Sequence, residues 1–262
     1  LQEVHQQQII SSVCTMAQGM AYFQKKIGLE KISLLENAEE LEEYCYFVAG
    51  AVGEMLCGFF INEISGLSTQ SKKIMRENAV SFGLGLQITN ISKDIVVDRG
   101  RGWSYVPRTY IEANGLTPDE FHSGKSSEND LKVLNCLLNK TVGHLNDALD
   151  FILAIPRSYA RIRLFCIWPL WMAMETVAKL HNNHDLLKSN ANVKIPRRTV
   201  KRILRQTPFI YWSNKLLHRS FSNILKTEDF GSFDHFSIGQ LKKRLNGLSL
   251  DNIPSKTQTY EF

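Results

Sequence analysis

Two carboxylates on one face of an otherwise apolar helix most constrain what this chain can fold into. The face is a stripe of four polar residues: Gln87, Asn90, Asp94 and Asp98. The steps between them are three, four and four residues, so at about 100° per residue they share one side of a helix. A carboxylate on a partly buried face is costly unless it is paired or holds a cation. The fold must therefore give this stripe cationic partners, solvent or a metal ion.

Spacing alone leaves two interpretations of the stripe open. Oxygen ligands one helical turn apart suit Mg²⁺, which takes one or two carboxylates and completes its octahedron with water and substrate phosphate. However, Lys93 precedes Asp94, and Arg101 follows Asp98 closely. The aspartates are therefore also interpretable as surface charges with local partners, worth only tenths of a kcal/mol.

Helical periodicity runs through most of the chain. We expect helices over residues 2–24, from a cap at Asn37 to about 63, and from Ser68 or Thr69 to about 100. Further helices are expected at 129–154 and 157–183, with a basic one opening at Pro196. No segment shows sustained alternation, so a β-sheet is not expected. The prediction is an all-α protein, with a helical domain over 1–206 and, over 207–262, a C-terminal helical extension ending in a poorly ordered tail from about 244.

Composition limits the setting and the partners. The 262 residues are 44% hydrophobic, enough for a large core, and the five cysteines are scattered without a pairing pattern. We therefore expect a reducing, cytoplasmic location. We also expect a monomer. The net charge of +5 permits anionic substrates or an acidic membrane surface and does not argue for nucleic acid. No signal peptide is visible, and the longest apolar run, 164–174, is too short to span a membrane.

A second signal is the segment YCYFVAGAVGEMLCG at 44–58, in which small residues interrupt an aromatic-rich helix. Glycine inside a helix costs up to about 1 kcal/mol relative to alanine, so its presence needs a reason. One reason is close packing of two helices. The other is a groove for a long apolar ligand, whose lining would be Tyr44, Val48, Ala49, Val52 and Gly53.

Together these segments resemble the squalene/phytoene synthase family of head-to-head prenyl synthases. YCYFVAGAVGEML at 44–56 is followed by LQITNISKDIVVDRGRGWSYVP at 86–107, and MAQGMAYF, IPRSYARIRLFCIWPLWMA and KIPRRTVKRIL occur in the family's order. The resemblance covers roughly residues 9–205. It implies a single-domain isoprenoid-synthase-type helical bundle with a central apolar cavity. The form NISKD…DRGRGWSYVPR is closer to squalene-type members.

The resemblance also implies roles for individual residues. Asp94 and Asp98 match the carboxylates of the family's second aspartate-rich motif, which hold Mg²⁺ on a substrate diphosphate. Tyr105 matches an aromatic position that closes over the site, and Arg101 is a plausible diphosphate contact. The remaining matches are Gln87 and Asn90 as polar lining of the same pocket, and Tyr44, Val48, Ala49, Val52 and Gly53 as lining of the prenyl-chain cavity.

The implied reaction joins two farnesyl diphosphates through a cyclopropyl diphosphate to squalene, with Mg²⁺ and, by analogy, NADPH. The alternatives are a phytoene- or dehydrosqualene-type synthase without NADPH, and a non-catalytic, synthase-like assembly protein. The sequence departs from the family at Val97, where an acidic residue is usual, and at Lys93, where an arginine is common. The family's first aspartate-rich motif is absent. We therefore expect a piece of a longer parent that binds Mg-diphosphate weakly without turning it over.

Two further segments, an aromatic stripe and a basic run, have structural interpretations that do not require a role in catalysis. Phe165, Trp168 and Trp171 recur at helical spacing and are expected in the core. The basic run at 197–205 is either a solvated helix face or a surface for peripheral binding to the inner membrane surface, attractive because prenyl products are lipids.

Overall fold

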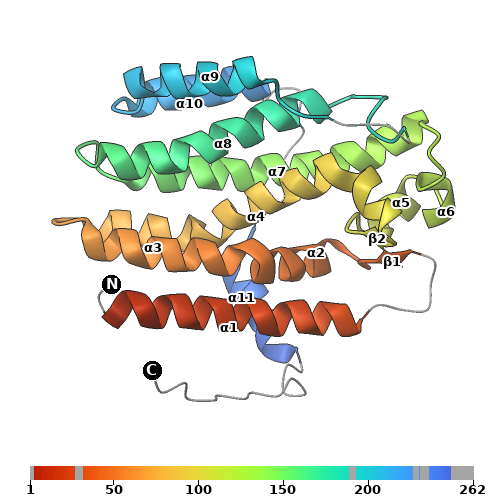
Figure 1. Ribbon diagram of the computed structural model, residues 1–262, viewed down its shortest axis with the longest axis horizontal. Helices are drawn as coiled ribbons and strands as arrows, with labels where there is room; N and C mark the ends of the chain where they lie inside the picture. The colour runs from red at the N-terminus through yellow and green to blue at the C-terminus, as the bar shows by residue number, and fades with distance from the viewer. Residues whose placement is uncertain (1–2, 27–31, 189–192, 227–229, 231–235, 249–262) are drawn as a thin grey trace.

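Long helices packed side by side dominate the part of the chain that the structure describes (Figure 1). The computed structural model describes residues 3–26, 32–188, 193–226, 230 and 236–248. Within them the long helices are α1 (Glu3–Lys25), α3 (Ala51–Glu63), α4 (Thr69–Gly100), α7 (Glu128–Ala154), α8 (Ala160–Leu180), α9 (Arg197–Gln206), α10 (Asn214–Leu225) and α11 (Ile238–Gly247). The shorter ones are α2 (Ala38–Cys45), α5 (Arg108–Ala113), α6 (Pro118–Phe121), the π-helix η1 (Tyr46–Gly50) and the 3-10 helix η2 (Thr207–Phe209).

The predicted helix starts are confirmed by their caps. Asn37 accepts from the Glu40 backbone N–H at 2.9 Å, and Ser68 accepts from the Ser71 N–H at 3.0 Å. Each cap satisfies one of the N–H groups that a first helical turn leaves without a partner. The helix expected from 37 to 63 is a continuous rod made of α2, η1 and α3. The π-helix within it was not expected; such segments are frequent at functional sites.

α4 is the centre of the bundle. It packs most extensively against α7, and also against η1, α3 and α8. Leu84 and Ile88 on α4 and Leu145 on α7 have no solvent exposure, so the core lies between these two helices. α1 covers one side of the rod, and α9 and α10 form the outermost layer beyond α8 (Figure 1). The all-α prediction is confirmed; the β structure described is one two-residue parallel pair, β1 (Ser33–Leu34) with β2 (Trp103–Ser104).

The rod from Ala38 to Glu63 is long and apolar enough to cross a membrane by length and composition. Its contacts indicate a core helix instead, because α1 and α4 pack against it. It also carries acidic side chains that are paired within the protein. Tyr46 donates to Glu54 at 2.9 Å, and Lys242 of α11 lies 2.6 Å from Glu54.

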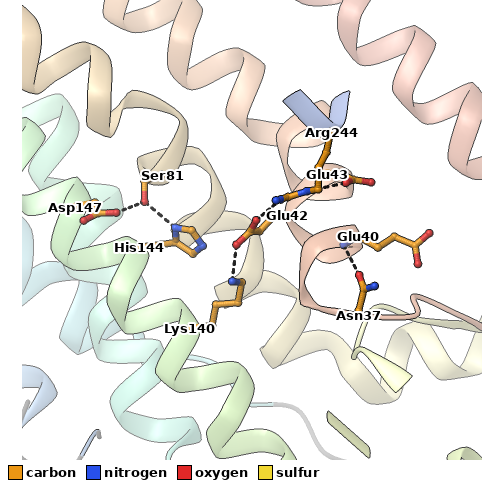
Figure 2. A network of polar contacts seen from close by, with 9 residues as sticks. All are labelled: Asn37, Glu40, Glu42, Glu43, Ser81, Lys140, His144, Asp147 and Arg244. Atoms are coloured by element: carbon orange, nitrogen blue, oxygen red, sulfur yellow. Dashed lines mark hydrogen bonds and ion pairs between the residues drawn. The ribbon is translucent and has the colours of Figure 1, made fainter. Parts of the chain in front are cut away.

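A buried ion network joins three helices that are far apart in sequence (Figure 2). Glu42 on α2 lies 2.6 Å from Lys140 on α7 and also pairs with Arg244 on α11, which reaches Glu43 at 3.0 Å. The Glu42 and Lys140 side chains are 11% and 12% exposed, so both charges are largely removed from water. Removing one member of such a network leaves an uncompensated buried charge.

Replacing Glu42 with glutamine should lower the free energy of unfolding by about 3 kcal/mol, because Lys140 would lose its carboxylate in a buried setting. Glu39→Gln is the matched control, since Glu39 lies exposed on the same helix. Chemical denaturation of both variants measures the difference. Equal stability of the two would show that Lys140 does not need the Glu42 carboxylate in the folded protein.

A second polar cluster lies in the core between α4 and α7 (Figure 2). The Ser81 hydroxyl donates to Asp147 at 2.6 Å, so the His144 Nδ1, 2.7 Å away, is the donor to Ser81. His144 Nε2 is buried without a hydrogen-bond partner, and the ring packs edge-on against Phe236. Burial, with a smaller contribution from Lys140, lowers the pKa of His144 to about 3, so the ring stays neutral.

The neutral state of His144 predicts a pH dependence of stability. Its folded-state pKa lies below the unfolded value of about 6.5, so the unfolded chain binds the extra proton and stability falls as pH drops below 6.5. Between pH 7 and pH 5 this loss is about 2 kcal/mol. We expect His144→Gln to flatten the pH profile of the unfolding free energy in that window. His184→Gln, at an exposed position, should leave the slope unchanged.

Candidate functional site

One face of α4 changes from apolar to acidic along its length. An apolar cavity is lined by Ala79, Gly83 and Leu86 of this face, and Asn90, one turn further along, lines a neighbouring cavity. Asp94 and Asp98 stand one and two turns further on. At 1.5 Å rise per residue, Gly83 and Asp94 are about 16 Å apart along the helix. The face therefore has the polarity of an elongated ligand with an apolar chain and a charged head.

The apolar cavity has a volume of about 270 Å³ and lies between the η1–α3 segment, α4, α7 and α8. Four residues predicted to line a prenyl cavity do line it: Val48, Ala49, Val52 and Gly53. The rest of the lining was not predicted. Leu56 and Phe60 come from the same rod as the four predicted residues, and the other walls come from helices remote in sequence: Ala79, Phe82, Gly83 and Leu86 of α4, Phe151 of α7, and Phe165, Cys166 and Pro169 of α8. No charged side chain is among the lining residues, so the cavity suits a hydrocarbon chain.

Glycines bring the cavity's two main walls together. A Cβ on Gly53 would lie 2.2 Å from the Ala79 carbonyl oxygen, and one on Gly83 would lie 2.4 Å from the Ala49 carbonyl oxygen. Both contacts are with backbone, which cannot rotate away. Close packing and a cavity lining, the two interpretations of segment 44–58, are therefore both present.

The acidic end has the local partners that the surface-charge interpretation predicted. Lys93 lies 3.0 Å from Asp94, and Arg101 lies 3.6 Å from Asp98. The Arg101 side chain is 71% exposed, whereas that of Asp98 is only 16% exposed. Burial raises the pKa of Asp98, the negative charge of Asp94 raises it further, and Arg101 and Lys93 only partly oppose this. Asp98 is therefore a largely buried carboxyl group next to a second carboxylate, and a bound cation would stabilise the charged form of both.

The donor set at this end fits a hard divalent ion bound together with phosphate. No group of three His, Cys, Asp or Glu side chains that could hold a metal exists within the described residues. Mg²⁺ needs only one or two protein carboxylates when substrate phosphates and water complete its shell. Asp94 and Asp98 would supply those carboxylates. Gln87 is half-buried one turn before Asn90 and is not among the residues lining either cavity.

An aromatic stack stands beside Asp98. The Tyr44 and Tyr105 rings stack with centroids 4.6 Å apart, and Trp103 stacks on Tyr105 at 5.7 Å. The Tyr44 hydroxyl donates to Tyr105, and burial raises the pKa of both phenols, with a contribution from Asp98. Both rings therefore stay neutral. Tyr44 is not among the residues lining the apolar cavity; it lies at the acidic end of the site.

A second, open cavity of about 790 Å³ continues from the first. It shares Leu86, Phe165 and Pro169 with the apolar cavity and adds Asn90 and Lys93. Phe165 is 53% exposed, so the expectation that it belongs to the core is wrong, whereas Trp168 is half-buried and packs against the core. Only Trp171 of that stripe is buried. Helical spacing showed that the three share a face but not that the face borders two cavities.

Comparison with known proteins identifies the architecture. The sequence pattern of the squalene/phytoene synthase family matches residues 1–199. The chain belongs to this family. A squalene synthase of Candida albicans is 32% identical over 213 residues, which are 77% of this chain and 44% of that protein. A bifunctional lycopene cyclase/phytoene synthase of Colletotrichum graminicola is 36% identical over 123 residues, which are 47% of this chain and 21% of that protein.

Solved structures of the family share the fold. A complex of TcSQS with a ligand superposes with a TM-score of 0.69 at 22% identity, covering 94% of this chain and 68% of that chain. A dehydrosqualene synthase complex gives 0.60 at 20% identity, covering 80% and 65%. The isoprenoid-synthase-type helical fold is confirmed. The chain spans less than half the length of the curated relatives it matches.

The glycine contacts generate a prediction about the site's walls. Gly83→Ala should lower the free energy of unfolding by 2 kcal/mol or more, about what overpacking costs, because the new methyl group meets the Ala49 carbonyl. Gly100→Ala is the control, since nothing lies within 4 Å of its Cβ position, and alanine favours the helix there. Thermal denaturation of both variants tests this. A stable Gly83→Ala variant would show that the two walls separate easily.

Proposed function

We propose that this chain carries the prenyl-diphosphate site of a Mg²⁺-dependent prenyltransferase that joins two farnesyl diphosphates head to head, through a cyclopropyl diphosphate, to squalene. The observation that supports it is the α4 face that runs from the cavity at Gly83 to Asp94 and Asp98. A prenyl diphosphate has the same succession of an apolar chain and an anionic head. Membership of the squalene/phytoene synthase family supports the same reaction class.

Different side chains of this protein would bind the metal ion, bind the diphosphate and shield the reacting carbons. Asp94 and Asp98 would hold Mg²⁺, which when bound neutralises charge on a leaving diphosphate. Lys93 and Arg101, beside those carboxylates, would contact phosphate oxygens. Tyr44 and Tyr105 stay protonated and offer neutral aromatic faces, which attract developing positive charge without trapping it as a phenolate would. The apolar cavity would keep water from the reacting carbons.

The product and the reductant belong to this proposal as well. Squalene would require hydride from NADPH, whereas a dehydrosqualene- or phytoene-type product would not. Relatives include both squalene and phytoene synthases, so the second product class is the alternative. The described residues supply one carboxylate pair to the site. We therefore propose that this chain binds Mg-diphosphate and that turnover needs further carboxylates.

The proposal predicts metal-dependent ligand binding. Farnesyl diphosphate should bind by titration calorimetry with Mg²⁺ and lose most of its affinity with a chelator. Asp98→Asn should weaken binding about tenfold or more, because one of two cation ligands is removed. Asp150→Asn, a carboxylate on α7 outside the site, is the matched control and should bind normally.

Two further measurements distinguish binding of the prenyl group from binding of the diphosphate. Val52→Trp should fill the cavity and weaken farnesyl diphosphate binding while leaving inorganic pyrophosphate binding unchanged. Product analysis with farnesyl and geranylgeranyl diphosphate, with and without NADPH, identifies the reaction.

Farnesyl diphosphate binding that is unchanged by Mg²⁺ removal and by Asp98→Asn would contradict the metal role. No binding of either ligand would favour a non-catalytic assembly protein.

A further inference from the structure

Positive charge is concentrated in one segment of this chain. Residues 193–226 contain nine lysines and arginines and no aspartate or glutamate. The rest of the chain carries 22 lysines and arginines against 26 aspartates and glutamates, a net charge of −4. The overall charge of +5 therefore conceals a strongly basic segment on an acidic body. That segment contains α9, η2 and α10, which form the outermost layer of the bundle (Figure 1).

The cationic side chains of α9 share one face of the helix, and most of them have no ion pair among the described residues. They lie within about 140° of the helix circumference at 100° per residue: Arg197, Arg198, Lys201, Arg202 and Arg205. All five are exposed, and of these only Arg202 has an ion pair among the described residues, with Glu175 of α8. Ile203 on the opposite side is buried. The fold thus fixes the helix by its apolar side and turns the cations outward.

Large apolar side chains are exposed beside these cations. Phe209 is 77% exposed and Trp212 is 53% exposed, and the Trp212 indole N–H donates to the Phe209 carbonyl at 2.9 Å, which holds the two together. Leu204 and Leu216 are also exposed, at 40% and 38%. Such exposure costs free energy in water and indicates a partner that covers it.

One groove brings the two kinds of side chain to the same surface. It has a volume of about 600 Å³ between α8, α9 and α10, and its lining includes Arg202 and Arg219 together with Phe209 and Leu216. Guanidinium groups next to apolar side chains match a surface that offers phosphates above hydrocarbon. Aromatic side chains with a polar edge, such as Trp212, favour that boundary.

We propose that the α9–η2–α10 layer is a docking surface for a membrane that carries anionic lipids. The α9 cations and Arg219 would lie against the headgroup phosphates, and Phe209 and Trp212 would enter the boundary below them. A nucleic acid would use the cations and leave the aliphatic side chains Leu204 and Leu216 in water. The surface lies on the far side of α8 from Phe165 and Pro169, so it is separate from the candidate active site.

Co-sedimentation of the chain with phosphatidylglycerol/phosphatidylcholine vesicles tests the proposal. The wild type should bind these vesicles at low salt, bind pure phosphatidylcholine vesicles weakly, and be released at about 0.5 M NaCl. The triple variant Arg198→Gln, Lys201→Gln, Arg205→Gln should lose about tenfold or more in affinity. Its matched control is Lys125→Gln, Lys132→Gln, Lys243→Gln, which removes the same charge from exposed positions elsewhere and should bind like the wild type.

The apolar contribution has its own variant. Phe209→Ser with Trp212→Ser should weaken vesicle binding about tenfold while its salt sensitivity remains. Circular dichroism and thermal denaturation establish that each variant is folded, and farnesyl diphosphate binding should be unchanged in all of them.

Four outcomes would overturn the proposal. The first two are no binding of the wild type to anionic vesicles, and wild-type affinity in the triple variant Arg198→Gln, Lys201→Gln, Arg205→Gln. The third is an equal loss of vesicle affinity in this variant and in its matched control. The fourth is equal or tighter binding of the wild type to a DNA duplex at the same salt. Self-association that the Phe209→Ser/Trp212→Ser variant abolishes would assign the surface to a second copy of the chain instead.

Discussion

The contact on which the rest of the structure depends is the close approach of the Ala38–Glu63 rod to α4. Gly53 and Gly83 allow the two backbones to meet where any side chain would collide with a carbonyl oxygen. This contact places Val48 and Val52 beside Leu86 around one cavity. Since the same rod begins with α2, it also sets Tyr44 close to Tyr105 at the acidic end of α4. The apolar and acidic parts of the candidate site are thus consequences of one packing contact.

The ion network around Glu42 fixes the other side of the rod. Lys140 of α7 and Arg244 of α11 reach the same carboxylate from helices about a hundred and two hundred residues away in sequence. Buried ion pairs contribute little net stability, because desolvation offsets their attraction. Here they link the three helices, because the Glu42 carboxylate of α2 lies within ion-pair distance of cations from both α7 and α11. The rod is therefore held between glycine contacts on one face and ion pairs on another.

The interior, the candidate site and the outer layer of the molecule differ in the charges that they carry. The interior carries the paired charges around Glu42 and the neutral cluster of Ser81 and His144, the site carries two neighbouring aspartates, and the outer layer carries the α9 cations, of which only Arg202 has an ion pair among the described residues. An anionic diphosphate and an anionic lipid surface are both complementary to positive charge. They would nevertheless meet different parts of the protein, because α8 separates the candidate site from the basic layer (Figure 1).

The sequence by itself determined most of the long helices, the caps at Asn37 and Ser68, and the polar stripe, but not the π-helix at Tyr46–Gly50. Local rules decide these features: Asn37 and Ser68 cap because their own side chains reach the backbone three residues on, and Asp94 and Asp98 share a face because of helical pitch. Tertiary structure decided what each face meets. Phe165 and Trp171 belong to the same helical stripe, yet one borders the cavities and the other is buried, because burial depends on neighbours from remote segments. For the same reason the cavity's far wall and the partners of Glu42 came only from the fold.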